Sequence, residues 1–372
     1  MTMSDESRYI RKIEQMVDPV KEGLTPLELL DLDRISSFED LLQAMSKTAF
    51  GGRRLGEALD VLETMVDDPE CHVVATFSGA MTVAKMGKLI CTMIEEGWVD
   101  TVISTGALMA HGFIESIGLK HYKYEPEKQW DTHLCRMGLN RVYDTLEPEV
   151  NFLQAEDVVE AVMEEISQEE HLSSHHLCRV IGSYLSRNYE GSGILKSAFE
   201  HQVPVYIPAF TDSELALDVA AMLLKKVSGI MAEDFEPSRL PFQFNPFLDL
   251  FDYTRRAVGA RKLGIFTIGG GVPRNWAQQL GPFVEMAVQR HPELNWDVKR
   301  FMYGVRICPE PDHWGGLSGC TYQEGISWGK FIPPERGGRF AEVMCDATIA
   351  WPILLKALQE KKHQHRGGHG QS

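Results

Sequence analysis

Residues 263–280, LGIFTIGGGVPRNWAQQL, carry the pattern that decides the fold: an apolar run, three successive glycines and a helical segment. The run is of strand length, and Pro273 is typical of the first turn of a helix. The same succession of strand, small-residue turn and helix occurs at 72–96, 203–224 and 341–358, and residues 98–104 (WVDTVIS) form a further strand candidate. This rhythm predicts an α/β protein with a parallel sheet covered by helices on both faces.

The composition favours a soluble globular protein over a nucleic-acid or membrane protein. The chain has 372 residues, of which 44% are hydrophobic, and a formal net charge of −16. The apolar fraction suffices for a packed core, whereas the acidic excess disfavours binding to phosphate backbones. No apolar run is long enough to span a membrane, and residues 1–15 lack the apolar stretch of a signal peptide. We therefore expect a cytoplasmic protein, with no nucleic-acid and no membrane partner.

The chain divides into three parts of unequal length. Residues 1–48 predict a helical lead-in, 49–357 a single α/β catalytic domain, and 358–372 a disordered tail that is rich in Gly and His. The tail could bind metal adventitiously. His171, His175 and His176 have plausible metal spacing, but no Cys or carboxylate stands out as a partner, so no metal site is predicted.

The turns after the strands are the expected ligand-binding positions, because parallel sheets bind ligands beyond the carboxyl ends of their strands. These turns are small or Gly-rich and lie at 78–80, 104–107, 209–212 and 269–271. The glycine triplet lacks the full G-x-G-x-x-G spacing, so an ordinary turn is as good an interpretation as a dinucleotide cradle. Asp212 and Asp346 follow two strands, where each could cap a helix or bind a ribose hydroxyl or an ammonium group.

Lys330 is the candidate nucleophile. Gly329-Lys330 does not belong to a phosphate-binding P-loop, because Phe331 replaces the required Ser or Thr. A lysine desolvated by the indole of Trp328 would have a lowered pKa and could form an imine. The alternative is an ordinary surface lysine.

Several long motifs give the chain a specific resemblance. From about Phe50 to Ala357 it resembles the deoxyhypusine synthase family, in the synthase-like branch found outside eukaryotes and related to homospermidine synthase. The motifs that carry this resemblance are FSGAMT (77–82), VDTVISTGA (99–107), GLNRVYDTLEPE (138–149), VPVYIPAFTDSELALD (203–218), TIGGGVPRNW (267–276), GGLSGCTYQEGISWGK (315–330) and CDATIAWP (345–352).

The resemblance implies a Rossmann-like fold, NAD as cofactor, and a homotetramer with active sites at dimer interfaces. It also implies a reaction in which a 4-aminobutyl group passes from spermidine, through a lysine imine, to an acceptor amine. By the same resemblance Lys330 is the nucleophile, Glu324 and Trp328 bind the polyamine, and Asp212 touches both cofactor and polyamine. The implied cofactor-binding residues are Ser104, Thr105, Gly106, Asp212, Asp346 and Ala347.

Departures from the family pattern fall at the polyamine end of the pocket. Ala110-His111 stands where the eukaryotic enzymes carry a Glu-Glu pair, and Asn275 stands where they carry a histidine. We therefore expect His111 and Asn275 to bind substrate, with a small diamine favoured as acceptor over a protein lysine. Two alternatives stay open: an NAD-binding homologue that acts as a sensor or scaffold without transfer activity, and a simple NAD dehydrogenase.

Overall fold

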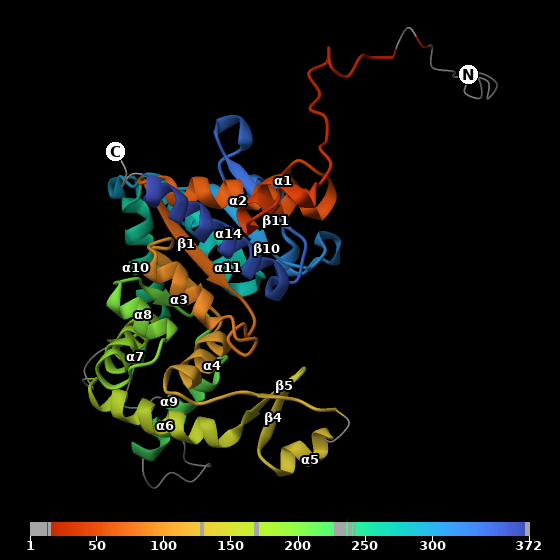
Figure 1. Cartoon of the computed structure of the whole chain (residues 1–372). Coiled ribbons are helices and arrows are strands. Elements are labelled where there is room, and N and C mark those ends of the chain that lie inside the picture. Colours follow the sequence, from red (N-terminus) through yellow and green to blue (C-terminus); the bar gives the residue numbers. More distant parts are fainter. Residues whose placement is uncertain are drawn as a thin grey trace, which may run out of the picture.

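A six-stranded parallel sheet runs through the centre of the molecule (Figure 1). The computed structural model describes residues 13, 16–126, 130–166, 171–226, 236, 240 and 243–368. The strand order is β11-β10-β9-β1-β2-β7, and every neighbouring pair is parallel. The strands are β1 (Cys71–Phe77), β2 (Thr101–Ser104), β7 (Val205–Tyr206), β9 (Lys262–Ile268), β10 (Phe301–Ile307) and β11 (Arg339–Val343).

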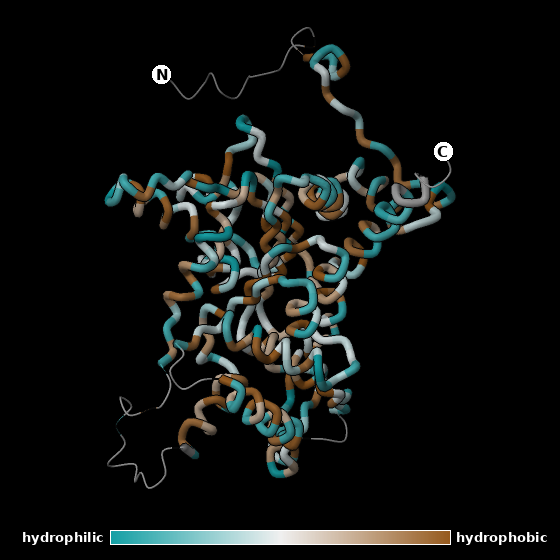
Figure 2. Tube along the Cα trace, turned by 90° about the vertical axis from the view of Figure 1, so that its left-hand side faces the viewer, coloured by the Kyte–Doolittle hydropathy of each residue, from teal (hydrophilic) through white to brown (hydrophobic). Residues whose placement is uncertain are grey.

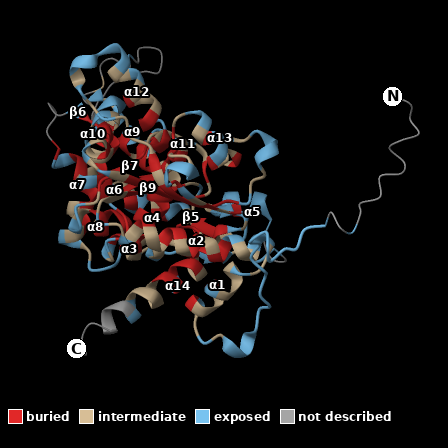
Figure 3. Ribbon diagram, turned by 90° about the horizontal axis from the view of Figure 1, so that it is seen from above, coloured by how far each residue is buried: buried red, intermediate tan, exposed pale blue. Residues whose placement is uncertain are grey.

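Both faces of this sheet are buried, because successive strand residues point to opposite sides and both sets are apolar. On β1, Val73 and Ala75 belong to one hydrophobic cluster and Val74 belongs to the other. The first cluster includes residues of α2 (Phe50–Asp67), α3 (Gly87–Glu95) and α14 (Ala347–Gly368). The second cluster includes residues of α10 (Pro246–Gly259), α11 (Gly271–Gln278) and α12 (Leu280–Arg290). Figure 2 shows hydrophobic segments concentrated in the interior of the molecule, and Figure 3 shows buried residues along the central strands and the helices around them. The predicted α/β architecture is confirmed.

A helical layer and a small antiparallel sheet extend the molecule beyond the edge strand β7 (Figure 1). The helices are α4 (Gly106–Ser116), α6 (Glu149–Glu164), α7 (Ser174–Asn188), α8 (Ile194–Glu200) and α9 (Glu214–Lys226). The antiparallel sheet has the order β3-β5-β4 and is accompanied by α5 (Asp131–Arg136). Its strands are β3 (Tyr122–Lys123), β4 (Leu139–Val142) and β5 (Thr145–Pro148), and a separate parallel pair joins β6 (His171–Leu172) to β8 (Gln243–Phe244).

The first and last of the described α-helices, α1 (Phe38–Ser46) and α14, both pack on α2. Helix α1 is capped by Ser37 and also packs on α14. The tail predicted from residue 358 differs from the structure, because α14 continues to Gly368. Lys361 pairs with Glu63 of α2 at 2.7 Å, and Lys362 pairs with Asp67 of α2, so the last turns are anchored to a neighbouring helix. Residues 369–372 lie outside the described residues. Among the described helices, none combines the length and apolar character that crossing a bilayer requires.

Candidate active site

A cavity of about 400 Å³ opens where β1, β2, β7 and β9 end. We call it the turn cavity. It brings together four of the predicted residues from turns far apart in the sequence: Ser104, Thr105, Gly106 and Asp212. The remaining lining residues are Ser78, Gly79, Ala107, Ala209, Thr211, Ser213, Glu214, Leu217, Gly271, Val272 and Pro273. The carboxyl ends of the strands are therefore hollowed, as expected for a parallel sheet that binds a ligand.

The turns around this cavity are tied to one another by hydrogen bonds. Thr105 caps α4, and its Oγ1 donates to the carbonyl oxygen of Gly79 at 2.6 Å. The hydroxyl of Ser78 donates to the carbonyl oxygen of Gly270 and accepts the Gly270 N–H at 3.3 Å. The preformed turns place the N-termini of α4, α9 and α11 at the cavity, where N–H groups and the helix dipoles favour an anionic ligand.

Close backbone approach explains a glycine at the start of α4. A Cβ atom on Gly106 would lie 2.3 Å from Cβ of Ser213, which is a collision. Gly106 thus lets α4 and the start of α9 come together beside the cavity. Gly269 and Gly271 have φ of +75° and +59°, in the left-handed region that favours glycine, so the triplet is required by the shape of the turn.

The Asp212 carboxylate is available to a ligand. Ser213 caps α9 instead, since its Oγ accepts the Ala216 N–H at 3.2 Å. Asp212 is exposed, and among the described residues its carboxylate makes no hydrogen bond or ion pair. Of the two roles considered for Asp212, helix capping is performed by Ser213.

Lys330 is buried, with only 7% of its surface exposed. Its Nζ donates to Oδ1 of Asn275 at 3.1 Å and lies 5.8 Å from the centroid of the Trp328 ring. The Lys330 N–H donates to the Gly325 carbonyl at 3.1 Å, and the Lys330 carbonyl accepts the Phe301 N–H at 3.0 Å. The lysine is thus fixed by α13 (Tyr322–Ser327) on one side and β10 on the other. An ordinary surface lysine does not fit this environment.

The surroundings of Lys330 favour its neutral form. Burial lowers the pKa of the Lys330 amine and outweighs the Cys320 and Glu324 side chains, which act to raise it. The nearby Arg274 guanidinium adds to the lowering. Arg274 itself is buried and donates from Nη1 to the Cys320 carbonyl at 2.6 Å. A neighbouring fixed cation and a partly dry pocket are the conditions that make a lysine nucleophilic.

Helix α11 connects this lysine to the turn cavity. Gly271 and Pro273 line the cavity, and Asn275, one half-turn further along, holds Lys330. Lys330 itself is not among the residues that line the cavity. Glu324 and Trp328 are exposed on and just after α13, with Trp328 64% exposed. We call Lys330, Trp328, Glu324 and Asn275 the lysine cluster.

Asp346 and Ala347 do not join the turn cavity within one chain. Both follow β11, which is four strands from β2, or roughly 19 Å at about 4.8 Å a strand. Oδ1 of Asp346 accepts two hydrogen bonds from Thr348, each at 2.7 Å, and so caps α14. Ala347 is buried at the start of that helix.

His111 lies outside both groups. It is buried on α4, where its Nδ1 contacts the carboxylate of Glu147, and it lines neither the turn cavity nor the lysine cluster. The structure therefore separates His111 from Asn275, although the sequence predicted both as substrate-binding residues.

Two acids on α9 lie at or near the cavity but were not among the predicted site residues. Glu214 lines the turn cavity, and its Oε2 is buried without a hydrogen-bond partner among the described residues. Asp218 lies one turn further along, and burial, with help from Glu156 and Glu214, raises its pKa to about 6. The spacing of Glu214 and Asp218, four residues apart on one helix, is the signal that could have found them.

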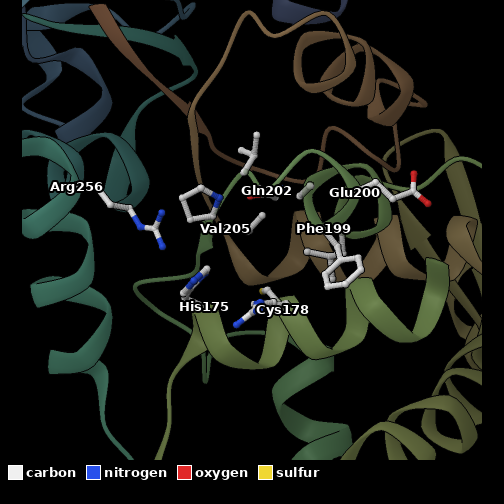
Figure 4. A pocket seen from close by; sticks show the side chains of 12 residues that line it. His175, Cys178, Phe199, Glu200, Gln202, Val205 and Arg256 are labelled. Carbon is white, nitrogen blue, oxygen red and sulfur yellow. The ribbon is translucent and has the colours of Figure 1, made fainter. Parts of the chain in front are cut away.

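A further cavity of about 490 Å³ lies between α7, α8 and the segment leading into β7 (Figure 4). His175, Cys178, Val205 and Arg256 help to line it. It contains no predicted site residue and lies at the start of β7 rather than at its carboxyl end. Burial raises the pKa of the Cys178 thiol and lowers that of His175, and both shifts disfavour a thiolate at Cys178.

The fold and the site define an α/β protein with a preformed turn cavity and a buried lysine close by. The chain belongs to the deoxyhypusine synthase family, whose model matches residues 40–358. It is 32% identical over 328 residues to "Probable deoxyhypusine synthase 2" of Methanosarcina acetivorans, covering 88% of each chain. It is 27% identical over 361 residues to a deoxyhypusine synthase-like protein of Chlorobaculum parvum, covering 96% of this chain and 94% of the relative.

A solved structure supports the fold. A crystal structure assigned to a deoxyhypusine synthase of Entamoeba histolytica superimposes with a TM-score of 0.55, covering 89% of this chain and 96% of that one. At 11% sequence identity this likeness concerns the fold alone. Membership of the family supports a transferase of the deoxyhypusine synthase type.

Proposed function

We propose that the protein is an NAD-dependent aminobutyl transferase in which Lys330 carries the transferred group. The observation that carries this proposal is the buried amine of Lys330, held by Asn275 and facing Trp328, with its pKa lowered by burial. An exposed structural lysine would need none of these features, whereas a lysine that forms an imine must lose its proton before it attacks.

The turn cavity fits the phosphates and a ribose of a dinucleotide. Gly106 and Gly271 keep the backbone open at the starts of α4 and α11, and the unpaired Asp212 carboxylate can accept hydrogen bonds from ribose hydroxyls. Ser104, at the end of β2, and Thr105, at the N-terminus of α4, would contact the bound group. When bound, NAD accepts a hydride from the polyamine and later returns it to the product.

Lys330 performs the transfer itself. Its neutral Nζ attacks the oxidised carbon of the polyamine, the departing diamine leaves with its nitrogen, and the aminobutyl group stays on Nζ as an imine. The acceptor amine then attacks the same carbon and releases Lys330. Asn275 Oδ1 accepts a hydrogen bond from Nζ, so it orients the lone pair without adding a charge that would hold the proton.

The acidic residues suit a cationic substrate. Glu324 is exposed beside Lys330 and can receive an ammonium group, and Trp328 offers an aromatic face to the methylene chain and the cation. Glu214 and Asp212 supply negative charge at the turn cavity. Because His111 is turned away and Asn275 is bonded to Lys330, the polyamine end differs from a pocket with a Glu-Glu pair. We therefore favour a small diamine as acceptor over a protein lysine.

The test traps the lysine imine. The purified protein is incubated with NAD and spermidine, treated with borohydride, and its peptides are analysed by mass spectrometry. We expect an added aminobutyl group on Lys330 and none on Lys299, which serves as the internal control. Lys330→Arg keeps the positive charge but cannot form the imine, so it should lose both label and turnover.

The acceptor is identified in the same assay. Putrescine added before the borohydride should discharge the label and yield homospermidine, whereas a protein acceptor would leave putrescine without effect. NAD binding without label from spermidine or related polyamines, together with an unchanged Lys330→Ala variant, would support the sensor or scaffold alternative. Turnover of a substrate by Lys330→Ala would instead indicate a simple dehydrogenase.

A further inference from the structure

A buried cluster of two histidines and one glutamate lies apart from the lysine cluster, and its function is not explained by the transfer reaction. His111 belongs to α4, His121 directly precedes β3, and Glu147 belongs to β5. One ring nitrogen of each histidine and one oxygen of Glu147 lie within 4.8 Å of one another. We propose that these three residues form a site for a divalent transition metal ion, with Zn²⁺ as the ion that fits the ligand set. We call it the His-His-Glu site.

The geometry converges on one point. Nε2 of His121 lies 3.2 Å from Oε2 of Glu147, and Nδ1 of His111 contacts the same oxygen. Glu147 is 1% exposed, and the two histidines are 7% and 9% exposed. Three potential ligand atoms, drawn from a helix, a loop and a strand, thus face a common centre that is shielded from solvent.

The polar atoms of the cluster lack well-oriented hydrogen bonds, which is the second observation. Both oxygens of Glu147, Nδ1 of His111 and Nε2 of His121 are buried, and the contacts of Oε2 with the two ring nitrogens do not have hydrogen-bond geometry. Leaving buried polar atoms unsatisfied is costly. A metal ion among them would accept a lone pair from each ligand and remove that cost.

The local charge also favours a cation. The carboxylates of Glu214 and Glu115, like that of Glu147, place negative charge near His111. Lys85 is the neighbouring cation: its Nζ lies 2.8 Å from Nδ1 of His121 and pairs with Glu115. Oε1 of Glu115 also lies 3.9 Å from Nδ1 of His121, the ring nitrogen that does not face Glu147. Such a carboxylate behind a metal-bound imidazole is the usual supporting arrangement.

The donor set indicates the kind of metal. Two imidazole nitrogens and one carboxylate oxygen are borderline ligands, suited to Zn²⁺ and related ions and unsuited to Ca²⁺ or Mg²⁺, which prefer oxygen alone. The fourth position would hold water. The ion would join α4, whose first turn forms the turn cavity, to the antiparallel sheet β3-β5-β4, and would thereby stabilise that sheet.

The experiment must exclude the histidine-rich tail. The full-length chain, purified without a histidine tag and with His363, His365 and His369 replaced by Gln, is stripped with a chelator and titrated with Zn²⁺. Calorimetry and elemental analysis measure the bound metal. We expect about one tight equivalent per chain and a higher melting temperature. Glu147→Gln and His121→Gln should each abolish the tight equivalent, while Glu149→Gln and His133→Gln, at exposed positions, should retain it.

A further measurement uses the chain with an intact His-His-Glu site, so its result does not depend on whether the variants fold. X-ray absorption of the Zn²⁺-loaded protein should show nitrogen and oxygen ligands at about 2.0–2.2 Å with the outer-shell scattering of two imidazoles. Glu115→Gln, which leaves the three ligands in place, should weaken binding roughly 10–100-fold without abolishing it. The proposal is overturned if no tight equivalent is bound, or if folded Glu147→Gln binds Zn²⁺ as well as its parent.

Discussion

The amine of Lys330 is buried, and its charge should therefore lower the stability of the folded protein, independently of any role in catalysis. Burial lowers the pKa of Lys330 from the ordinary value of 10.5. Below the lowered pKa the folded state must hold a charged, partly desolvated amine, and this penalty disappears as the pH rises from the folded pKa towards 10.5. We predict that Lys330→Met, which removes the charge, abolishes turnover but raises the melting temperature at neutral pH.

Thermal unfolding measured between pH 6 and pH 10 checks this sign. The stabilisation by Lys330→Met should shrink as the pH rises, because the native amine then becomes neutral. Lys356→Met, at an exposed position of α14, should show no such trend. A Lys330→Met variant that is less stable than the parent at every pH would show that the hydrogen bond to Asn275 outweighs desolvation.

Asp218 is an acid with a raised pKa, so the stability of the folded protein should fall, rather than rise, with pH. Burial, then Glu156 and Glu214, raise its pKa from 3.8 to about 6. The folded state therefore holds a proton that the unfolded state has lost, and stability declines as the pH rises from about 3.8 to about 6. We predict that Asp218→Asn stabilises the protein above about pH 6 and has no effect below pH 4. Chemical denaturation across this range tests the prediction, with the exposed Asp157→Asn on α6 as control; equal effects of both variants would contradict it.

The contact between α4 and α9 depends on a missing side chain. A Cβ on Gly106 would lie 2.3 Å from Cβ of Ser213, and 3.1 Å from the carbonyl oxygen of Asp212. Gly106→Ala should therefore force α9 away from the turn cavity, lower the free energy of unfolding by about 1–3 kcal/mol, and weaken NAD binding. Denaturant unfolding and a binding titration measure the two effects.

A second substitution shows whether the collision is the cause. Ser213→Gly removes the Cβ that Gly106→Ala would strike, so the double variant should recover part of the lost stability. Ser213→Ala keeps that Cβ and removes only the Oγ, which would lie 2.7 Å from the new Cβ, so it should give less recovery than Ser213→Gly. If Ser213→Gly and Ser213→Ala behave alike in the Gly106→Ala background, collision with the Ser213 Cβ is not the cause of the loss.

Helices and strands with a strong period were predictable from the sequence. Residues 263–268 and 72–77 were identified as strands because both faces of a covered parallel sheet are apolar. Strand β10 (Phe301–Ile307) was missed, because Gly304 and Arg306 interrupt its apolar run. The structure explains why these two residues stand in a buried strand. A Cβ on Gly304 would collide with the Tyr322 ring, and Arg306 donates to the carbonyl oxygen of Ser318 at 2.6 Å.

The candidate site was predictable where a motif lies on one turn and unpredictable where distant segments meet. The turn residues 104–106 and the lysine of residues 327–330 were found from local sequence. His121 and Glu147 carry no local signal, since they meet His111 only after α4 packs against the antiparallel sheet. The burial of Lys330 likewise depends on β10 and α11, two elements that come before it in the chain.

At the scale of the whole molecule, Asp212 and Asp346 offer a test of whether the site is shared between chains, as the family resemblance implies. Asp212 lines the turn cavity, whereas Asp346 follows β11 at the opposite edge of the sheet. The family resemblance implies active sites at dimer interfaces, and in that arrangement Asp212 of one chain and Asp346 of a second copy would contact one NAD. In a two-fold dimer each chain would then contribute Asp212 to one site and Asp346 to the other.

Mixing two inactive variants tests this arrangement. We predict that Asp212→Asn and Asp346→Asn each lose NAD binding and turnover, and that oligomers formed by co-refolding the two regain activity. In a mixed dimer the chain with Asp346→Asn supplies an intact Asp212, and its partner supplies an intact Asp346, so one of the two sites is complete. Each variant refolded alone is the control. If both residues act within one chain, no mixed dimer contains a complete site, and activity stays absent. If the site is built from two chains, one of the two sites in each mixed dimer is complete, and about half of the parent turnover per mixed dimer should return.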